Sequence, residues 1–379
     1  MAGPLAGVRV VEMAGIGPAP FAGMILADLG ADVVRVDRVE GGLSLPVPEP
    51  DLLSRGKRSI QVDLKHPDGA AVVRALVERA DVFIEGYRPG VAERLGVGPD
   101  ALLAANPRLV YGRMTGWGQD GPLASTAGHD ITYLAVTGLL HAIGSPDGDP
   151  VPPLNLLGDF GGGGAVLAIG VLAALLHARQ TGTGQVVDAA IVDGAALLGT
   201  LVFGMLHGGA WTDRRGANLL DGAAPFYGTY RTSDGRHVAV GPLEPRFFAE
   251  FATRLGGLDG FDQYDPANWP ALKQAIAARF ATRTRDEWVA VFEGSDACVA
   301  PVLSLGEAAA SRHPQLAARD TFVTVDGVAQ PAPAPRFSTT RPDLPGRPPH
   351  LGEHTREVLT EWGVPDLPRL FREGVVTGG

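Results

Sequence analysis

The amino-acid sequence predicts an α/β fold in which the first third of the chain forms a parallel, doubly wound sheet. Short apolar runs recur through this part of the sequence, and helix-like segments separate several of them. Parallel strands are covered on both faces, so they appear in a sequence as nearly continuous apolar runs. From about residue 223 the pattern changes to a hairpin followed by helices, which predicts a second, smaller α+β domain.

The strands expected in the first third have apolar centres, and helices over 21–29 and 70–80 lie between some of them. They are VRVVEM (8–13), DVVRVD (32–37), SIQVDL (59–64), DVFIEG (81–86) and RLVYGRM (108–114). Further along, the strand QVVDAAI (185–191) lies between two long apolar segments that we expect to be helical, 161–178 and 191–207.

The smaller domain begins with a hairpin signal. The segment FYGTYRTSDGRHVAVG (226–241) pairs two strand patterns around Asp234-Gly235, a dipeptide favoured in tight hairpin turns. Helices are expected over 245–256 and 270–283, and the proline-rich PAPAPRF (331–337) ends the domain. The predicted ranges are 1–210 for the large domain, 223–330 for the small domain and 331–379 for a C-terminal return to the large domain.

Composition and charge exclude several classes of protein. The chain has 379 residues, 45% hydrophobic and 20% charged, which is typical of globular domains with a sizeable core. A net charge of −10 without clusters of Lys and Arg argues against nucleic-acid binding. The single cysteine, Cys298, excludes an internal disulfide and fits a cytoplasmic location. The opening MAGPLAGVRV does not resemble a signal peptide, and the apolar run 161–176 is shorter than the roughly 20 residues that span a membrane. We therefore expect no membrane attachment.

Two motifs that often hold cofactors are present only in imperfect form. The segment AGIGPAP (14–20) lacks the third glycine of a dinucleotide fingerprint, and its prolines remove N–H donors from a phosphate cradle. Arg38 follows the strand-ending Asp37, so it could bind the ribose phosphate of NADP or of coenzyme A, or be a surface charge. HLGEH (350–354) matches a zinc-protease pattern by its letters, but its glycine disfavours the required helix. We expect neither a metal nor a nicotinamide cofactor.

Four titratable residues lie where predicted elements begin or end. His129 and Asp130 follow a glycine-rich segment at the start of an apolar helix. Asp159, in NLLGDFGGGG, lies at the head of another helix, and Glu244 follows the end of a strand. Each aspartate could simply cap its helix, because carboxylates there accept backbone N–H groups. The alternative is that these side chains form a catalytic group.

Together these motifs resemble CoA-transferase family III, also called the CaiB/BaiF family. The resemblance covers nearly the whole chain, and several matching motifs are long. It rests on the opening segment 1–38 and on DLK (63–65), EGYRPGVAERLG (85–96), MTGWGQDGP (114–122), AGHDITYLAVTG (127–138), GDFGGGG (158–164), GTGQVVDAAIVDG (182–194), PAPRFS and LGEHTREVL. Within the family, the sequence most resembles the α-methylacyl-CoA racemase branch.

The resemblance implies a Rossmann-like large domain built from both ends of the chain, a smaller α+β domain and an interlocked homodimer. In that dimer the active site lies between the large domain of one subunit and the small domain of the other. The ligand is an acyl-coenzyme A, and no separate cofactor is implied. The positions expected to contact coenzyme A are Arg38, Val62, Asp63, Leu64, Lys65, Gly86, Tyr87, Arg88, Arg94, Gly128, Ile131, Thr132 and Tyr133.

The resemblance also implies roles for the titratable residues. In the racemase branch, His129 and Asp159 would move the α-proton of a 2-methyl-branched acyl-CoA on opposite faces, with Glu244 near the histidine. The enolate oxygen needs donors, and the helix start Asp130–Thr132 offers backbone N–H groups. In the transferase branch, Asp130 would instead attack the thioester and form a mixed anhydride. A non-catalytic acyl-CoA-binding paralogue is a third alternative, but the pair of His129 and Asp159 favours the racemase.

Overall fold

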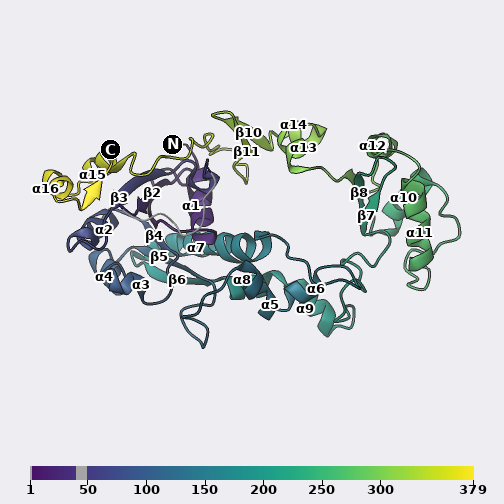
Figure 1. The fold of residues 1–379 in the computed structure, drawn as a ribbon, viewed down its shortest axis with the longest axis horizontal. Helices are drawn as coiled ribbons and strands as arrows, with labels where there is room; N and C mark the ends of the chain where they lie inside the picture. Colours follow the sequence, from purple (N-terminus) through teal and green to yellow (C-terminus); the bar gives the residue numbers. More distant parts are fainter. Residues whose placement is uncertain (1, 40–48) are drawn as a thin grey trace. The chain divides into compact units, whose positions relative to one another are not determined.

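The computed structural model describes residues 2–39 and 49–379 and divides into two compact units (Figure 1). The larger unit combines Met1–Thr137, Leu154–Leu198 and His313–Gly379, and the smaller unit combines Gly138–Pro153 and Gly199–Arg312. Both ends of the chain therefore belong to the larger unit. The sequence assigns no role to the loop 41–56, and residues 41–48 of it lie outside the described part of the chain.

A seven-stranded sheet forms the centre of the larger unit, in the order β12-β3-β2-β1-β4-β5-β6. The strands β1 to β6 are parallel to their neighbours. They are β1 (Arg9–Met13), β2 (Asp32–Asp37), β3 (Arg58–Val62), β4 (Val82–Glu85), β5 (Val110–Thr115) and β6 (Gln185–Ala190). The predicted α/β class and its strands are confirmed, with small shifts at the strand ends. The strand order reverses between β1 and β4, which is the switch point of a doubly wound sheet.

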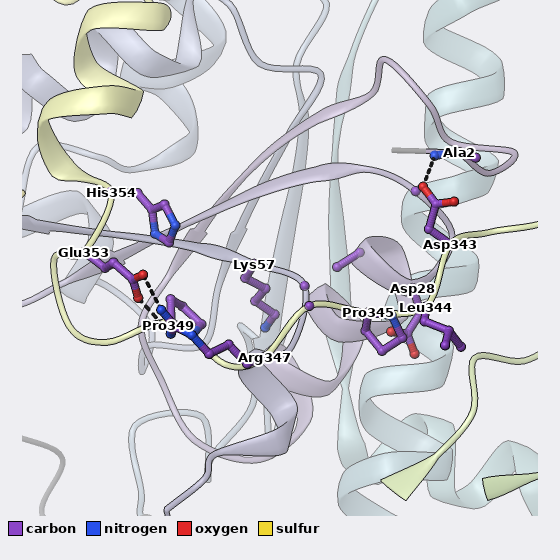
Figure 2. Close-up of a pocket in the computed structure, with 14 residues that line it drawn as sticks. Ala2, Asp28, Lys57, Asp343, Leu344, Pro345, Arg347, Pro349, Glu353 and His354 are labelled. Carbon is purple, nitrogen blue, oxygen red and sulfur yellow. Dashed lines mark hydrogen bonds and ion pairs between the residues drawn. The ribbon is translucent and has the colours of Figure 1, made fainter. Parts of the chain in front are cut away.

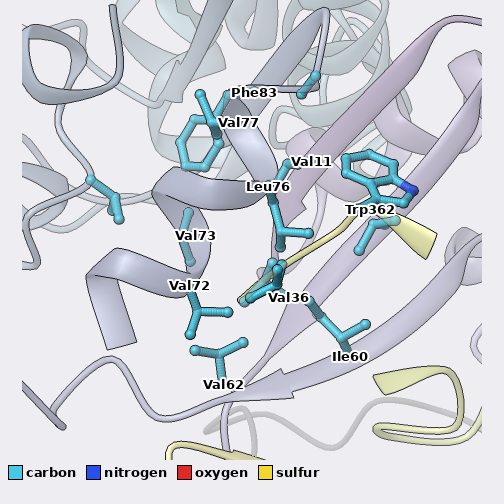
Figure 3. Packing of buried hydrophobic residues seen from close by; sticks show 14 of the residues in the cluster. Val11, Val36, Ile60, Val62, Val72, Val73, Leu76, Val77, Phe83 and Trp362 are labelled. Atoms are coloured by element: carbon cyan, nitrogen blue, oxygen red, sulfur yellow. The ribbon is translucent and has the colours of Figure 1, made fainter. Parts of the chain in front are cut away.

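Helices cover both faces of the sheet. Successive side chains of a strand point to opposite faces, so Val10 and Val11 of β1 belong to two different buried clusters. α1 (Pro18–Asp28) and α7 (Val166–Thr181) cover the Val10 face. The Val11 face is covered by α2 (Gly69–Val77), α4 (Pro99–Ala105) and α15 (Thr355–Glu361); Figure 3 shows the side chains packed there.

The C-terminal segment completes the sheet. β12 (Val376–Thr377) pairs antiparallel with β3, and Val376 lies opposite Val62. Trp362, just after α15, is fully buried in the same cluster as Val11. These contacts explain why the last residues of the chain belong to the unit that the first residues begin.

The hairpin of β10 (Phe322–Val325) and β11 (Val328–Pro331) belongs to the larger unit, although the predicted small domain extends to residue 330. The reason is a buried arginine. Arg55 donates to Gln330 Oε1 at 3.0 Å and to the Pro331 carbonyl at 2.7 Å, while its other nitrogens pair with Asp28. This anchor joins residues far apart in the sequence, so no local pattern predicts it.

The smaller unit contains the predicted hairpin. β7 (Gly228–Arg231) and β8 (His237–Val240) are antiparallel, and β9 (Val299–Pro301) extends them to a three-stranded sheet. Residues 138–153 join this unit because the Arg215 guanidinium donates to three of their carbonyl oxygens. Helices of this unit are α6 (Leu139–Ala142), α9 (Thr200–His207), α10 (Pro245–Leu255), α11 (Trp269–Phe280), α12 (Arg285–Phe292) and α13 (Leu305–Ala309).

Two of the predicted helices differ from expectation. The segment expected to be helical over 191–207 forms α8 (Ile191–Leu198) and α9, which belong to different units. The segment expected over 161–178 begins earlier, as a π-helical stretch, η2 (Leu156–Ala165), that continues into α7. By length and composition alone, the continuous stretch Leu156–Thr181 could cross a membrane. In the structure one side of α7 packs on β5 and β6, while Ile169 and Leu176 are exposed.

The remaining elements are short. They are η1 (Leu52–Ser54), α3 (Val91–Arg94), α5 (Asp130–Val136), α14 (Pro314–Ala318) and α16 (Leu367–Arg372). All of them belong to the larger unit.

Candidate active site

A cavity of about 510 Å³ lies at the carboxyl ends of the central strands in the larger unit. Residues 16–19 follow β1, residues 86–89 follow β4, and residues 114–117 comprise the end of β5 and the two residues after it. Ligands of doubly wound sheets bind at this edge, near the switch point of the strand order. The segment before α5 and the start of η2 complete the wall. The lining includes Gly86, Tyr87, Arg88, Gly128, His129, Tyr133 and Asp159.

His129 lines this cavity from the residue directly before α5, where its backbone is extended. Its N–H donates to Thr132 Oγ1 at 3.0 Å, and its carbonyl accepts the Thr132 N–H at 2.8 Å. These two local bonds fix the turn that carries the imidazole. Because the Thr132 N–H already donates to the His129 carbonyl, it is not free for an oxyanion, although the sequence analysis expected donors throughout Asp130–Thr132. The N–H groups of Asp130 and Ile131 are the ones that this arrangement leaves for an oxyanion.

Asp159 lies inside η2, and the position before this segment is occupied by Asn155. The interpretation of Asp159 as a helix cap is therefore wrong. Asn155 Nδ2 donates a hydrogen bond to Asp159 Oδ2 at 3.5 Å. A Cβ added at Gly17 would lie 3.4 Å from the same oxygen. The carboxyl thus lies against the start of α1, where Pro18 has no N–H to offer it.

Four consecutive glycines, 161–164, let η2 pack closely on its neighbours. A Cβ on Gly162 would lie 2.5 Å from the Ala195 nitrogen in α8, and one on Gly164 would lie 2.5 Å from the Pro18 carbonyl oxygen. Any side chain at these positions would push η2 away from α8 or α1. π-Helical turns are rare and concentrate at functional sites, and here the glycines permit one beside the cavity.

Asp130 connects the two helix starts. It is the first residue of α5 and is 8% exposed. Its Oδ1 accepts the Asp159 N–H at 2.7 Å. A Cβ at Gly158 would overlap the Asp130 carboxylate, so this close approach requires glycine at 158. The carboxylate therefore ties α5 to η2, and the interpretation of Asp130 as the cap of its own helix is wrong.

The surroundings of Asp159 favour its protonated form. Burial raises the pKa of the Asp159 carboxyl, and the negative charge of Asp130 raises it further. The hydrogen bond from Asn155 and the nearby His129 act in the opposite direction, and the net shift is upward. A carboxyl that holds a proton more readily than usual can alternate between acid and base.

An aromatic pair forms the wall beside His129. The Tyr133 and Trp117 rings meet edge to face, with centroids 4.7 Å apart. A Cβ at Gly116 or Gly128 would overlap the Tyr133 ring, so both glycines make room for it. Burial raises the pKa of Tyr133 to about 12, with a further contribution from the Asp159 charge. The Tyr133 hydroxyl therefore stays protonated across the physiological range.

Comparison with known proteins identifies the family. The model of CoA-transferase family III matches residues 5–355. This chain belongs to CoA-transferase family III. Mouse alpha-methylacyl-CoA racemase is 47% identical over 366 residues, with 95% of this chain and 93% of the relative covered. The human alpha-methylacyl-CoA racemase is 45% identical over 364 residues, with the same coverage. The crystal structure of a CaiB/BaiF family protein from Brucella suis superposes with a TM-score of 0.81 at 30% identity, covering 96% of this chain and all of that one.

The family resemblance stated from the sequence is thus confirmed, while the individual coenzyme-contacting positions stay predictions. Five of them line the cavity: Gly86, Tyr87, Arg88, Gly128 and Tyr133. Ile131 and Thr132 lie in the first turn of α5, and Arg94 ends α3. Val62 is buried in the core under the sheet, so its side chain faces away from solvent and only its backbone could meet a ligand.

The rest of the segment after β3 forms a turn. Asp63 Oδ1 accepts the Lys65 N–H at 2.9 Å, and the Lys65 side chain is exposed. Leu64 packs partly against the core. Among the predicted positions 62–65, Lys65 is therefore the residue that presents a positive charge to solvent.

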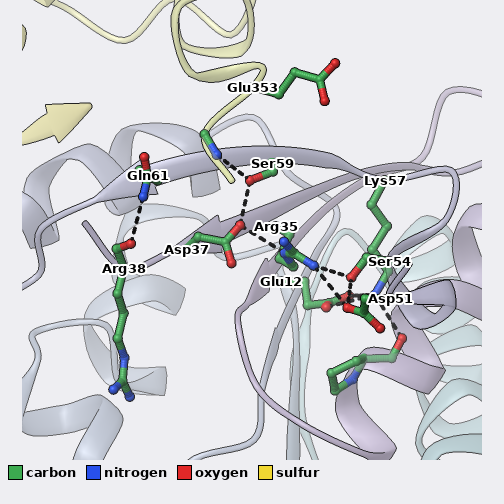
Figure 4. Close-up of polar contacts among 12 residues, drawn as sticks. Glu12, Arg35, Asp37, Arg38, Asp51, Ser54, Lys57, Ser59, Gln61 and Glu353 are labelled. Carbon is green, nitrogen blue, oxygen red and sulfur yellow. Dashed lines mark hydrogen bonds and ion pairs between the residues drawn. The ribbon is translucent and has the colours of Figure 1, made fainter. Parts of the chain in front are cut away.

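Arg38 follows β2, and its surroundings hold its backbone while leaving the side chain exposed (Figure 4). Gln61 Nε2 donates to the Arg38 carbonyl at 3.1 Å. The preceding residue, Asp37, accepts from Arg35 Nε at 2.9 Å and from Ser59 Oγ at 2.6 Å. This buried network fixes the strand end, so a phosphate held by Arg38 would meet a backbone that is already ordered.

Glu244 belongs to the smaller unit, directly before α10, and its side chain is exposed. Burial raises the pKa of the Cys298 thiol, and the negative charge of Glu244 raises it further. The role of Glu244 toward His129 stays a prediction.

A second cavity, of about 320 Å³, lies beside the C-terminal segment of the larger unit (Figure 2). Its charged side chains have partners: Glu353 pairs with Arg347, and Lys57 pairs with Glu12 in the fully buried core. Glu353 belongs to the motif HLGEH, whose letters resemble a zinc site. Across residues 2–39 and 49–379, no group of three or more His, Cys, Asp or Glu side chains is placed to hold a metal ion.

The sequence analysis missed three contributors to the first cavity: Asn155, Trp117 and the turn of Gly17 and Pro18. Asn155 precedes Asp159 by four residues, so the spacing would have indicated it had a helical turn been expected there. The turn at Gly17 lies in AGIGPAP, which the sequence analysis tested only as a nucleotide cradle. For Trp117 no signal was available, because its contact with Tyr133 depends on the fold.

Proposed function

We propose that this protein is a racemase that inverts the α-carbon of 2-methyl-branched acyl-CoA thioesters by two-base proton transfer. The observation that carries the proposal is the cavity that both His129 and Asp159 line. The mouse and human relatives named alpha-methylacyl-CoA racemase, at 47% and 45% identity, support the same substrate class.

The chemistry requires one free base and one protonated acid on opposite faces of the α-carbon. In one direction His129 removes the α-proton, the electron pair moves into the thioester carbonyl to form an enolate, and Asp159 returns a proton to the other face. In the reverse direction the two residues exchange these roles. An imidazole titrates near neutrality, whereas an ordinary carboxyl is almost fully ionised there. The raised pKa of Asp159 therefore supports its part as an acid.

The enolate oxygen would accept hydrogen bonds from the N–H groups of Asp130 and Ile131, which the first turn of α5 does not occupy internally. Glu244 would orient the imidazole and select its tautomer. The exposed Arg38, Lys65, Arg88 and Arg94 would bind the phosphates of coenzyme A, because arginine offers a bidentate fork to phosphate. No metal, nucleotide or flavin takes part in these steps.

The interlocked homodimer belongs to the same proposal. α7 exposes Ile169 and Leu176, and α9 exposes Leu201 and Phe203, each by more than two fifths of its surface. Apolar residues exposed in groups mark interaction surfaces. Sedimentation at decreasing protein concentration would test the dimer, and a folded, fully active monomer would contradict it. A cytoplasmic location is part of the proposal as well.

Deuterium oxide separates the three alternatives in one experiment. A single enantiomer of a 2-methylacyl-CoA is incubated with the protein in deuterium oxide, without a free acid. Loss of optical purity together with α-deuterium uptake is the expected result. In a parallel incubation with a carboxylic acid added, transfer of the CoA group to that acid, with a hydroxylamine-sensitive acyl-enzyme, would show a transferase instead. Binding without either reaction would show a non-catalytic paralogue.

A further inference from the structure

Asp130 lies beside the reacting groups but faces away from the cavity. Within the described part of the chain, the lining of the cavity includes its neighbour His129 and its partner Asp159, but not Asp130 itself. Asp130 as a whole residue is 8% exposed, and its Oδ1 accepts the Asp159 N–H at 2.7 Å. A nucleophile that attacks a thioester needs an oxygen open to the substrate, whereas Oδ1 of Asp130 is engaged by the Asp159 N–H and Asp130 does not line the cavity.

The contact with Asp159 is built into the fold. A Cβ at 158 would overlap the Asp130 carboxylate, so a larger residue there would displace the carboxylate from the Asp159 N–H. The bond therefore holds the backbone of a π-helical turn, which lacks the tighter hydrogen bonding of an α-helix. Asp159 is the fourth residue of this segment, so its N–H is among those at a helix start that lack an acceptor within the helix, and Asp130 supplies one.

We propose that the Asp130 side chain has a positioning role: its carboxylate holds the backbone at Asp159 and thereby orients the Asp159 carboxyl, without itself touching the substrate. This inference rests on the proposed racemase function. It distinguishes this chain from a transferase, in which the same aspartate would form the acyl-enzyme.

The charge of Asp130 adds a second, measurable consequence. Burial is the main cause of the raised pKa of Asp159; the Asp130 charge raises it further, and Asn155 and His129 lower it. Tyr133, which faces Asp159 from α5, is neutral, and Arg88 lies near Tyr133. Replacing Asp130 by a neutral residue lowers the pKa of Asp159. Proton removal by Asp159 then extends to lower pH than in the wild type, and proton donation by Asp159 is lost at lower pH.

The test compares Asp130→Asn with Asp130→Ala in the full-length protein. Asparagine keeps an acceptor oxygen but removes the charge, whereas alanine removes both. We expect Asp130→Asn to stay within about tenfold of the wild-type kcat, and Asp130→Ala to lose about 100-fold, which is the cost of a misplacement of about 1 Å. KM for the acyl-CoA should change little in either variant. In Asp130→Asn the acidic limb of the pH profile for single-enantiomer deuterium uptake should move to lower pH.

Amide hydrogen exchange over residues 156–165 gives a readout that needs no turnover. Asp130→Ala should exchange faster than the wild type in this segment, and Asp130→Asn should not.

Asp130→Asn that is folded but as inactive as Asp130→Ala would show a nucleophile and overturn the proposal. Wild-type rates, pH profile and exchange in both variants would overturn it as well. A wild type that takes up no α-deuterium refutes the racemase function, while the exchange measurement still decides whether Asp130 holds this turn. If Asp130→Ala does not fold, the pH profile of Asp130→Asn decides the question.

Discussion

The two helix starts at the cavity hold their functional residues by different means. His129 is fixed by local bonds to Thr132, three residues away. Asp159 is fixed by a bond from its N–H to Asp130, 29 residues away, and by close packing of glycines on two other helices. The histidine is exposed and the aspartate is half-buried. The extra tertiary structure thus surrounds the carboxyl, whose pKa burial and the charge of Asp130 raise.

The largest expected effect comes from removing either functional side chain. His129→Ala and Asp159→Ala should each lower racemisation by about 10²–10⁴-fold, the usual contribution of a general acid or base. Each variant keeps one base, so each should still exchange the α-proton of one enantiomer, and the two variants should prefer opposite enantiomers. Deuterium uptake from each pure enantiomer measures this. Near-wild-type racemisation by Asp159→Ala would mean that only His129 belongs to the chemistry.

The packing of η2 can be broken without touching a titratable group. Gly162→Ala should lower the free energy of unfolding by about 1–3 kcal/mol, because the new methyl group overlaps α8 and overpacked positions cost that much. Denaturant unfolding checks it. The matched control is Gly306→Ala in α13, where a Cβ meets nothing within 4 Å and a gain of about 0.5 kcal/mol is expected. Equal stability of the two variants would mean that the glycines are not required for close packing.

Arg38→Ala tests binding of coenzyme A without changing either helix start at the cavity. We expect it to weaken binding of coenzyme A by about 1.5–3 kcal/mol, since it removes a charge-assisted bond to phosphate. Binding of 3′-dephospho-coenzyme A should change far less. Calorimetric titration with both ligands measures the difference, and equal losses would show that Arg38 does not hold the 3′-phosphate. The enantiomer preference of deuterium uptake should stay that of the wild type.

For the last treatment, removal of metal ions, we expect no change in activity. Exhaustive treatment with a chelator should leave the rate of racemisation unchanged, because neither proton transfer is assigned to a metal. Loss of activity that a divalent ion restores would contradict this, and would mean that side chains alone do not account for the difference between His129 and Asp159.

Local patterns were sufficient for most of the larger unit. β1 to β5 were predictable because buried parallel strands are continuous apolar runs, and the hairpin of β7 and β8 because Asp234-Gly235 favours its turn. Unit boundaries were less predictable. Arg55 binds the hairpin of β10 and β11 to the larger unit, and Arg215 binds residues 138–153 to the smaller one. Both contacts join residues distant in the sequence.

The sequence by itself determined the fold class, the family and the identities of the titratable residues, because apolar periodicity and long motifs are properties of the chain. Only the tertiary structure decided what surrounds those residues. It showed Asp159 inside a π-helical turn and Asp130 bonded to the Asp159 backbone, where the sequence left two helix caps as an alternative. The physical reason is that burial, close approach of glycines and the charge of a distant carboxylate depend on segments brought together by folding, and these contacts set the pKa of Asp159.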